Sequence, residues 1–203
     1  MTTKLLLATR NAKKLTELQQ ILDAALGASR IQLVGLDAVA EYLEVPETGL
    51  TFGENALIKA REGVRHTGLP TVADDSGLAV DALSGMPGVF SARWSGRHGD
   101  DRANLDLVLA QTADVPEQHR GAAFVCAAAL VLPGGKEHLV DGRMTGRLLR
   151  APRGEGGFGY DPIFIAEGQQ RTNAELTPEE KNAISHRGKA FRALAKVIAK
   201  ELA

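Results

Sequence analysis

An almost unbroken apolar run over residues 122–132 is the feature that most constrains the fold of this chain. Its eleven residues, AAFVCAAALVL, carry no charge. An apolar run of this length that ends at turn residues predicts a long buried strand. Pro133, Gly134 and Gly135 follow as a turn, and residues 137–140 are expected to return as the antiparallel strand of a hairpin.

Strands and helices alternate along much of the chain. Short apolar runs predict strands, and apolar residues at helical spacing predict helices. Thr177 and Pro178, followed by two acids, are typical of a helix start, and Asp100 or Asp101 could cap another helix. One mixed α/β domain over residues 1–203 is expected. The expected strands are 4–8, 31–36 and 71–73, the extended segment is 78–83, and the expected helices are 13–26, 52–66, 100–111 and 184–202.

Charge and cysteine content exclude several classes of protein. The net charge of −1 provides no basic surface for long nucleic acid, although a few lysines suffice for a nucleotide. The single cysteine, Cys126, can build neither a disulfide framework nor a cysteine-based metal site, and it fits a reducing, cytoplasmic setting. No apolar stretch reaches 18 residues, so no membrane span is expected, and the apolar run after Lys4 is too short for a signal peptide.

The segment TRNAKK separates the first expected strand from the first expected helix. In a strand, polar loop and helix arrangement, loop amides and the helix N-terminus can face a phosphate. Thr9 and Asn11 add side-chain hydrogen bonds to such a loop. Lys13 and Lys14 could neutralise a polyphosphate, although a single lysine on a helix is usually only solvated.

Two adjacent acids, Asp74 and Asp75, are expected just after the strand at residues 71–73. With Glu47 from a loop, they could hold a hard divalent cation, and Mg²⁺ prefers oxygen ligands and often bridges to substrate phosphates. The alternative is an Asx-type turn that closes the strand.

The segment GEGGFGYDPIF combines glycines, two aromatic residues, an acid and a proline. Glycines let the backbone lie close to a ligand. Phe158 offers a flat face on which a base could stack, and Asp161 offers a carboxylate or a cap. The alternative is a glycine-rich hairpin that leads into a strand over residues 162–165.

A further polar group, Ser185-His186-Arg187, follows an expected helix break. Arginine presents fixed donors to a carbonyl or phosphate, and His186 could donate as well. The alternative is a helix cap at Ser185 beside a surface arginine. The sequence has no G-x-S-x-G elbow, no Walker loop and no H-x-x-x-H pair, which argues against a serine hydrolase, a P-loop enzyme and a histidine-paired metal site.

Six motifs in a fixed order resemble the inosine triphosphate pyrophosphatase family, also called dITP/XTP pyrophosphatases. The resemblance implies hydrolysis of dITP, ITP and XTP to the monophosphate and pyrophosphate with Mg²⁺, which cleanses the nucleotide pool. It also implies a homodimer and an elongated α/β fold, whose strongly bent central sheet carries two lobes with a cleft between them. The motifs are TRNAKK, PETGLTFGENALIKAR, ADDSGL, GMPGVFSARWSG, GGFGYDP and EKNAISHRGKA.

The resemblance also assigns roles to individual residues. Asp75 is implied as the catalytic proton acceptor, and Glu47 and Asp75 as the metal-associated acids. The other matching residues form a phosphate-binding loop, a set of further contacts and a base pocket. The loop is Thr9, Arg10, Asn11, Ala12, Lys13 and Lys14; the further contacts are Lys59, Asp74, Ser76 and Lys181; the base pocket is Phe158, Gly159, Tyr160, Asp161, His186 and Arg187.

Two positions depart from the family pattern. Arg10 stands where many relatives have a small residue, which is expected to alter phosphate affinity, and residues 143–146 replace a commoner Trp-Pro-Gly turn. Neither departure touches the acids, so activity is expected to survive. Three alternatives stay open: another nucleotide hydrolase of the Maf or dUTPase-like kind, a nucleotide-binding module without activity, and a structural domain with glycine-rich turns.

Overall fold

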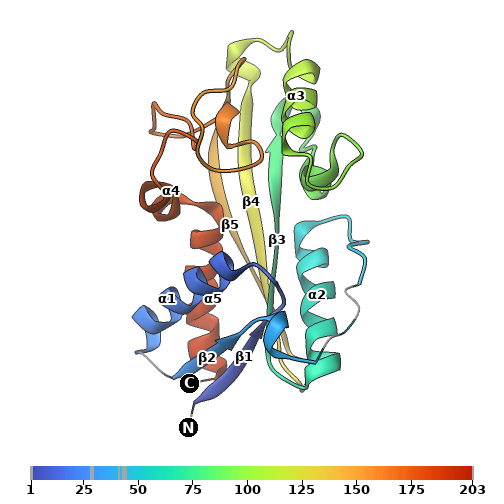
Figure 1. The fold of residues 1–203 in the computed structure, drawn as a ribbon, viewed down its shortest axis with the longest axis vertical. Coiled ribbons are helices and arrows are strands. Elements are labelled where there is room, and N and C mark those ends of the chain that lie inside the picture. The colour runs from blue at the N-terminus through green and yellow to red at the C-terminus, as the bar shows by residue number, and fades with distance from the viewer. Residues whose placement is uncertain (1, 28–29, 41, 43–44, 203) are drawn as a thin grey trace. The chain divides into compact units, whose positions relative to one another are not determined.

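The structure of the chain is a computed structural model that describes residues 2–27, 30–40, 42 and 45–202 (Figure 1). The chain divides into two compact units, and each is built from separate segments. Strands β3, β4 and β5 each pass from one unit into the other. The prediction of one domain over residues 1–203 stays a prediction. Unit 1 is Met1–Asp75, Cys126–Gly142 and Gly188–Ala203, and unit 2 is Ser76–Val125 and Arg143–Arg187.

Over the residues that the structure describes, six strands form one mixed sheet in the order β2-β1-β3-β4-β5-β6. Strand β1 is parallel to both β2 and β3, and β6 is antiparallel to β5. The expected α/β class, with helices flanking a mixed sheet, is confirmed. The strands are β1 (Thr3–Leu7), β2 (Ile31–Val34), β3 (Thr71–Val80), β4 (Gly121–Val131), β5 (Glu137–Leu148) and β6 (Phe164–Ala166), and the helices are α1 (Ala12–Leu26), α2 (Phe52–Thr67), α3 (Asp101–Gln111), α4 (Pro178–Ile184) and α5 (His186–Leu202).

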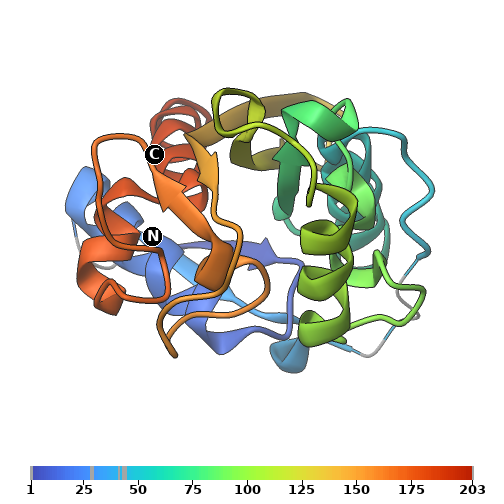
Figure 2. The ribbon, with the colours of Figure 1, turned by 90° about the horizontal axis from the view of Figure 1, so that it is seen from above.

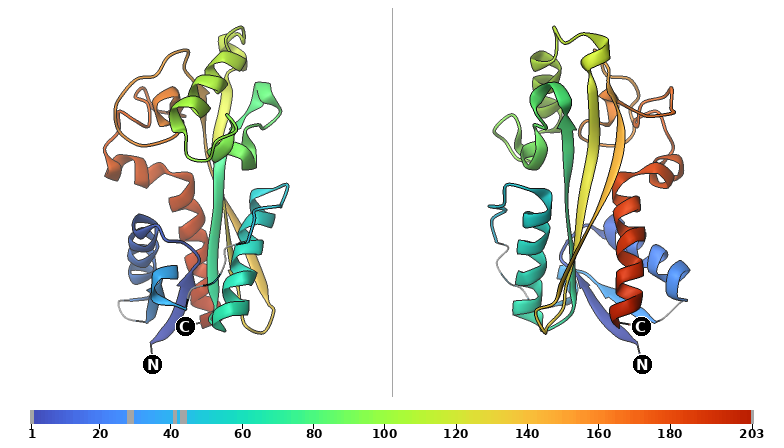
Figure 3. Two further views of the ribbon diagram at one scale, coloured as in Figure 1. Left: turned by 45° about the vertical axis from the view of Figure 1, so that its right-hand side comes forward. Right: turned by 180° about the vertical axis from the view of Figure 1, so that it is seen from behind.

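Unit 1 buries both faces of its part of the sheet. Successive side chains of β4 point to opposite faces. Cys126, Ala128 and Leu130 join a core with α1 and α5, whereas Ala127 and Ala129 join a core with α2. Figure 3 shows α2 and α5 on opposite sides of the strands in both views. Burial on both faces explains why the run at residues 122–132 is apolar at every position.

Side-chain caps fix where the helices of unit 1 begin. Asn11 caps α1 by accepting hydrogen bonds from the backbone amides of Lys13 and Lys14. Thr51 and Glu54 form a capping box at the start of α2. These caps set the ends of the two loops that carry the predicted phosphate-binding and acidic residues.

Unit 2 has its own apolar core, which brings α3 together with the strand segments of that unit. Its largest fully buried side chain belongs to Arg120. The Arg120 guanidinium donates to the carbonyl oxygens of Thr112 at 2.5 Å, Leu148 at 3.0 Å and Leu149 at 2.8 Å, which ties the C-terminal end of α3 to the end of β5. In Figure 2, α3 is the yellow-green helix.

Several expected elements have different limits in the structure. The DDSG segment lies inside β3 and does not follow it, so the prediction of acids just after a strand is wrong. The polar side chains at residues 74 and 75 remain within the strand because each has polar partners, described below. Residues 143–146, expected in a turn, lie within β5, whose alternating exposed and buried positions hide it from a search for apolar runs. Strand β6 begins at Phe164, after a short 3₁₀ turn over Asp161–Ile163.

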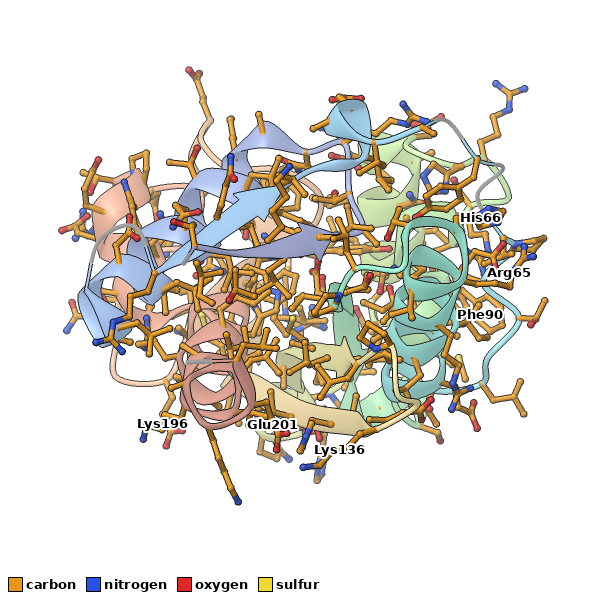
Figure 4. All side chains as sticks on the ribbon, turned by 90° about the horizontal axis from the view of Figure 1, so that it is seen from below. Arg65, His66, Phe90, Lys136, Lys196 and Glu201 are labelled. Atoms are coloured by element: carbon orange, nitrogen blue, oxygen red, sulfur yellow. The ribbon has the colours of Figure 1, made fainter. Side chains whose placement is uncertain are left out.

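Ion pairs hold the edges of unit 1. Lys136, in the turn between β4 and β5, donates to Glu201 near the end of α5 at 2.7 Å, and Figure 4 shows the two side chains close together. Arg65 and His66, also labelled there, both contact Glu62 one turn earlier in α2, and the hydrogen bond from Arg65 lowers the pKa of Glu62 to about 2.

Among the described helices, none is long and apolar enough to cross a membrane.

Candidate functional site

The loop after β1 leads into the N-terminus of α1. Asn11 accepts from the amides of Lys13 at 3.0 Å and Lys14 at 3.3 Å, and the Asn11 amide itself donates to the Thr9 hydroxyl at 3.1 Å. Arg10 is half-exposed and pairs with Asp37 at 3.2 Å. The loop therefore has a fixed shape, and its cationic side chains project from a helix start, where an anion is favoured.

Lys14 and Asp74 form a charged pair at the first turn of α1. The Lys14 ammonium donates to both Asp74 carboxylate oxygens at 2.8 Å. The Asp74 side chain is almost fully buried, and the Cys126 thiol lies 4.0 Å from one of its oxygens. Asp74 thus holds Lys14 in place beside the loop.

Glu47, Lys59 and Asp75 form a second charged group. The Lys59 ammonium lies 2.6 Å from Glu47 Oε1 and 3.8 Å from Asp75 Oδ1. The buried amide of Asn55 donates to Asp75 Oδ2 at 3.0 Å. Burial acts to lower the pKa of Lys59, but the Asp75, Glu47 and Asp74 carboxylates outweigh it, so the pKa lies above its ordinary value and the ammonium stays charged.

The two adjacent acids of β3 serve different faces of the sheet. Neighbouring residues of a strand point in opposite directions. Asp74 follows Val72 toward the core of α1 and α5, whereas Asp75 follows Ala73 toward the core of α2. Asp75 therefore joins Glu47 and Lys59, while Asp74 joins Lys14.

The Glu47 and Asp75 carboxylates fit a hard divalent cation. Both converge on one positive centre, the Lys59 ammonium, and their oxygens are ligands that Mg²⁺ accepts. Within the part of the chain that the structure describes, no group of three or more His, Cys, Asp or Glu side chains is placed to hold a metal. A site with two carboxylates suits Mg²⁺, which commonly keeps several waters and takes further oxygens from substrate phosphates.

Unit 2 contains a pocket of about 130 Å³. It brings together every residue that the sequence predicts for base recognition, together with Ser76 and Lys181. Its walls come from β3, the segment before α3, β4, the glycine-rich segment and the junction of α4 with α5. The lining residues are Ser76, Gly77, Leu78, Ser91, Ala92, Asp101, Phe124, Phe158, Gly159, Tyr160, Asp161, Lys181, His186 and Arg187.

Asp161 organises the glycine-rich wall of this pocket. Its buried carboxylate accepts from the Phe158 amide at 2.9 Å, from the Asn173 side-chain amide at 3.2 Å and from the Lys181 ammonium. Gly157 has a φ of +74°, and a Cβ there would lie 2.3 Å from Asp161 Oδ2, so only glycine fits. Asp161 thus acts as an internal anchor for the turn.

Phe158 is the exposed aromatic face that the sequence predicts. It is 62% exposed, and the Lys181 ammonium lies 4.6 Å from the centre of its ring. Lys181 therefore joins the acid and the ring of the same turn. A flat, exposed ring on a rigid turn is suited to stacking against a planar ligand.

The junction between α4 and α5 contributes two nitrogen-donor side chains, His186 and Arg187, to the lining. Ser185 ends α4, and α5 begins at His186, which confirms the expected helix break. The His186 ring stacks on Phe124, with ring centres 5.1 Å apart and 17° between the planes. The Arg187 guanidinium donates to the Ser76 hydroxyl at 3.4 Å. Nitrogen donors therefore line this part of the pocket.

The sequence-predicted residues fall into one group in each unit. Thr9, Arg10, Asn11, Ala12, Lys13, Lys14, Glu47, Lys59, Asp74 and Asp75 belong to unit 1, and Ser76 and the base-pocket residues belong to unit 2. Asp75 and Ser76 are consecutive in β3, so one peptide bond joins the acidic group to the pocket lining. The roles given to these residues stay predictions.

Sequence reasoning missed three residues that support these groups. Phe124 lies in the apolar run, where it is indistinguishable from a core residue. Asn55 is a fully buried amide within α2, and the sequence alone does not distinguish it from a surface asparagine. The sequence predicts Asp101 only as one of two candidate helix caps, but the structure gives the cap to Asp100, which accepts from the Ala103 amide at 3.1 Å.

Comparison with known proteins agrees with this arrangement of motifs. The model of the Ham1 family matches residues 5–197. A curated protein of Mycobacteroides abscessus, named dITP/XTP pyrophosphatase, is 64% identical over 191 residues, which cover 94% of this chain and 92% of the relative. A Streptomyces coelicolor protein of the same name is 64% identical over 197 residues, with 97% of each chain covered.

Solved structures are similar over nearly the whole chain. The crystal structure of a nucleoside-triphosphatase, or dITP/XTP pyrophosphatase, from Mycobacterium abscessus has a TM-score of 0.82 at 63% identity, covering 95% of this chain and 98% of that one. A HAM1 protein from Coxiella burnetii has a TM-score of 0.88 at 41% identity, covering 98% of this chain and 100% of that one. On the family match and the close relatives together, this chain belongs to the Ham1 family.

Proposed function

We propose that this chain hydrolyses the non-standard purine nucleoside triphosphates ITP, dITP and XTP to the monophosphate and pyrophosphate, and so removes them from the nucleotide pool. The observation that carries the proposal is the pocket of unit 2, where an exposed Phe158 ring, the Arg187 guanidinium and the His186 imidazole line one cavity. The curated relatives are named dITP/XTP pyrophosphatase, which supports dITP and XTP as substrates.

The charged groups of unit 1 suit a triphosphate. Phosphoanhydride hydrolysis depends mainly on neutralising charge and aligning the attacking water. Lys14 and Lys59 would offset the charge of the phosphate tail, because their carboxylate partners hold both ammonium groups in place. Asp75 would orient the water and accept its proton, while the Asn55 amide fixes its carboxylate.

Mg²⁺ is the proposed cofactor, held by Glu47 and Asp75. When bound, it would neutralise the phosphate oxygens and polarise the scissile anhydride. Attack at the α-phosphorus would release pyrophosphate as one unit. Lys181, in the other unit, would add positive charge near the nucleotide.

Selection among purines would come from the edge of the base. Hypoxanthine and xanthine carry a 6-keto oxygen, which accepts hydrogen bonds, whereas adenine carries a 6-amino group, which donates them. Arg187 and His186 offer donors, so adenine would face donor against donor. A buried polar group left unpaired costs about 1–3 kcal/mol, enough to discriminate strongly between the two bases.

A nucleotide panel tests the proposed activity. Pyrophosphate release is measured for ITP, dITP, XTP, GTP, ATP and dUTP, with Mg²⁺ and with excess EDTA. We expect kcat/KM for ITP, dITP and XTP to exceed that for ATP by about a hundredfold or more, and EDTA to abolish turnover. A preference for dUTP would favour a Maf-type or dUTPase-like enzyme, and binding without pyrophosphate release would favour a nucleotide-binding module.

We also propose that the protein acts in the cytoplasm as a homodimer, as the family resemblance implies. Light scattering on the purified chain is expected to give twice the 21.6 kDa of one copy at micromolar concentration. A mass that stays at one copy up to the highest concentration would contradict the dimer. Neither result would affect the proposed chemistry.

A further inference from the structure

Two consecutive acids open α3, and only one of them caps the helix. Asp100 takes the capping position, where its carboxylate accepts from the Ala103 amide. Asp101, the first residue of the helix, instead accepts from the Gly159 amide at 2.8 Å, across 58 positions of sequence. The Asp101 side chain therefore serves the glycine-rich turn and leaves the cap to its neighbour.

This contact is one of two carboxylate anchors on adjacent amides. Asp161 accepts from Phe158, and Asp101 accepts from Gly159. Asp161 lies within the turn itself, whereas Asp101 comes from another element. Gly159 also has a left-handed φ of +58°, a conformation that side chains rarely adopt. Asp101 thus holds the turn at the point where its backbone is least constrained by its own side chains.

Helix α3 is a rigid support for such a contact. Leu105 and Val108 are buried in the core of unit 2. Arg120 binds the carbonyl of Thr112 just after the last residue of the helix, and the Asn104 side chain accepts from the Ser95 amide at 2.7 Å. The helix is therefore fixed along its length, so its first side chain has a defined position.

We propose that Asp101 is a positioning residue for base recognition, which sets the orientation of the Phe158 ring by holding the Gly159 amide. This inference rests on the proposed function of the pocket. Phe158 precedes the held amide directly, and its ring is largely exposed, so its position depends on the backbone of the turn and on the Lys181 ammonium beside it. Loss of the anchor lets the stacking face move while the phosphate and metal groups of unit 1 keep their own contacts.

Steady-state kinetics on ITP provides the test. For Asp101→Ala we expect KM to rise about tenfold with kcat within about twofold of wild type. The variant loses binding energy that the substrate and the transition state share, and the reacting groups are untouched. Asp101→Asn keeps an oxygen acceptor and is expected to recover most of the affinity. The matched control is Asp106→Asn, on the same helix, where an exposed carboxylate pairs with exposed Arg102.

An Asp101→Ala enzyme with wild-type KM, or an Asp106→Asn enzyme with the same loss, overturns the proposal. So does a fall in kcat with KM unchanged, since that is expected of a reduced folded fraction. Wild-type turnover of ITP is measured in the same series, so failure of the proposed function is seen separately.

A measurement on the folded protein covers the case in which Asp101→Ala does not fold. Amide hydrogen exchange by NMR is expected to be about tenfold slower at Gly159 in wild type than in Asp101→Leu, whose side chain has a similar size but accepts no hydrogen bond. Equal exchange rates in the two proteins would rule out the anchor.

Discussion

Asp75→Asn is expected to lower kcat for ITP by a hundredfold or more, about 3 kcal/mol in the activation free energy. The amide side chain has the shape of the carboxylate but can neither accept a proton nor serve as an anionic metal ligand. The Asp75 side chain is 12% exposed and is held by Asn55 and Lys59. Bulk water therefore has little access to act as proton acceptor in its place. Pyrophosphate release at saturating ITP and Mg²⁺ is the measurement.

The structure offers a matched control for this variant. Asp141 lies on an exposed position of β5 in the same unit, and Asp141→Asn is expected to leave kcat within about twofold of wild type. Thermal unfolding of both variants shows whether the protein stays folded. Near-normal turnover of folded Asp75→Asn would rule out Asp75 as the proton acceptor.

Arg187→Ala is expected to raise KM for ITP about thirtyfold while changing kinetics with ATP by less than threefold. A hydrogen bond from a charged group is worth about 1.5–3 kcal/mol, and here it would be made only to a 6-keto base. Arg187 lines the pocket and contacts Ser76, so the substitution also removes that contact. The measurement is kcat/KM for the two nucleotides under identical conditions.

Arg192→Ala serves as the control, because Arg192 is exposed on the same helix α5. The Arg192→Ala variant is expected to have the wild-type kcat/KM with both ITP and ATP. Equal losses for ITP and ATP in Arg187→Ala would mean that the arginine binds a feature common to both, such as phosphate, and would contradict base recognition by this side chain.

The sequence predicts best those elements whose environment is uniform. Strand β4 is buried on both faces, so its apolar run identifies it directly. The starts of α3 and α4 follow from Asp100 and Thr177, since capping is a local interaction between a side chain and nearby amides. These elements can be predicted from the local sequence without information on the rest of the fold.

Elements that depend on distant partners are predicted less well. Strand β3 continues through Asp74 and Asp75 because Lys14, Lys59 and Asn55 supply partners from α1 and α2. A reader of the sequence sees two charges and expects a strand end. Strand β5 is also hard to predict, because every second side chain is exposed and polar residues interrupt any apolar run.

The candidate site shows the same division. The ordered motifs, through the family resemblance, predict eight of the fourteen residues that line the pocket, as well as the acidic group of Glu47 and Asp75. Asp101 and Phe124 could not be assigned, since their contacts with Gly159 and His186 join segments far apart in the sequence. Such roles depend on tertiary contacts, which no local pattern encodes.

The chain crosses between the two units at four peptide bonds, after Asp75, Val125, Gly142 and Arg187. Neither half can therefore be excised as a continuous gene fragment, and a single protease cut at any crossing leaves both halves tied through the remaining links. A chimera that grafts unit 2 of one relative onto unit 1 of another needs four matched junctions. One of them divides Asp75 from Ser76, where the register of a strand must be kept.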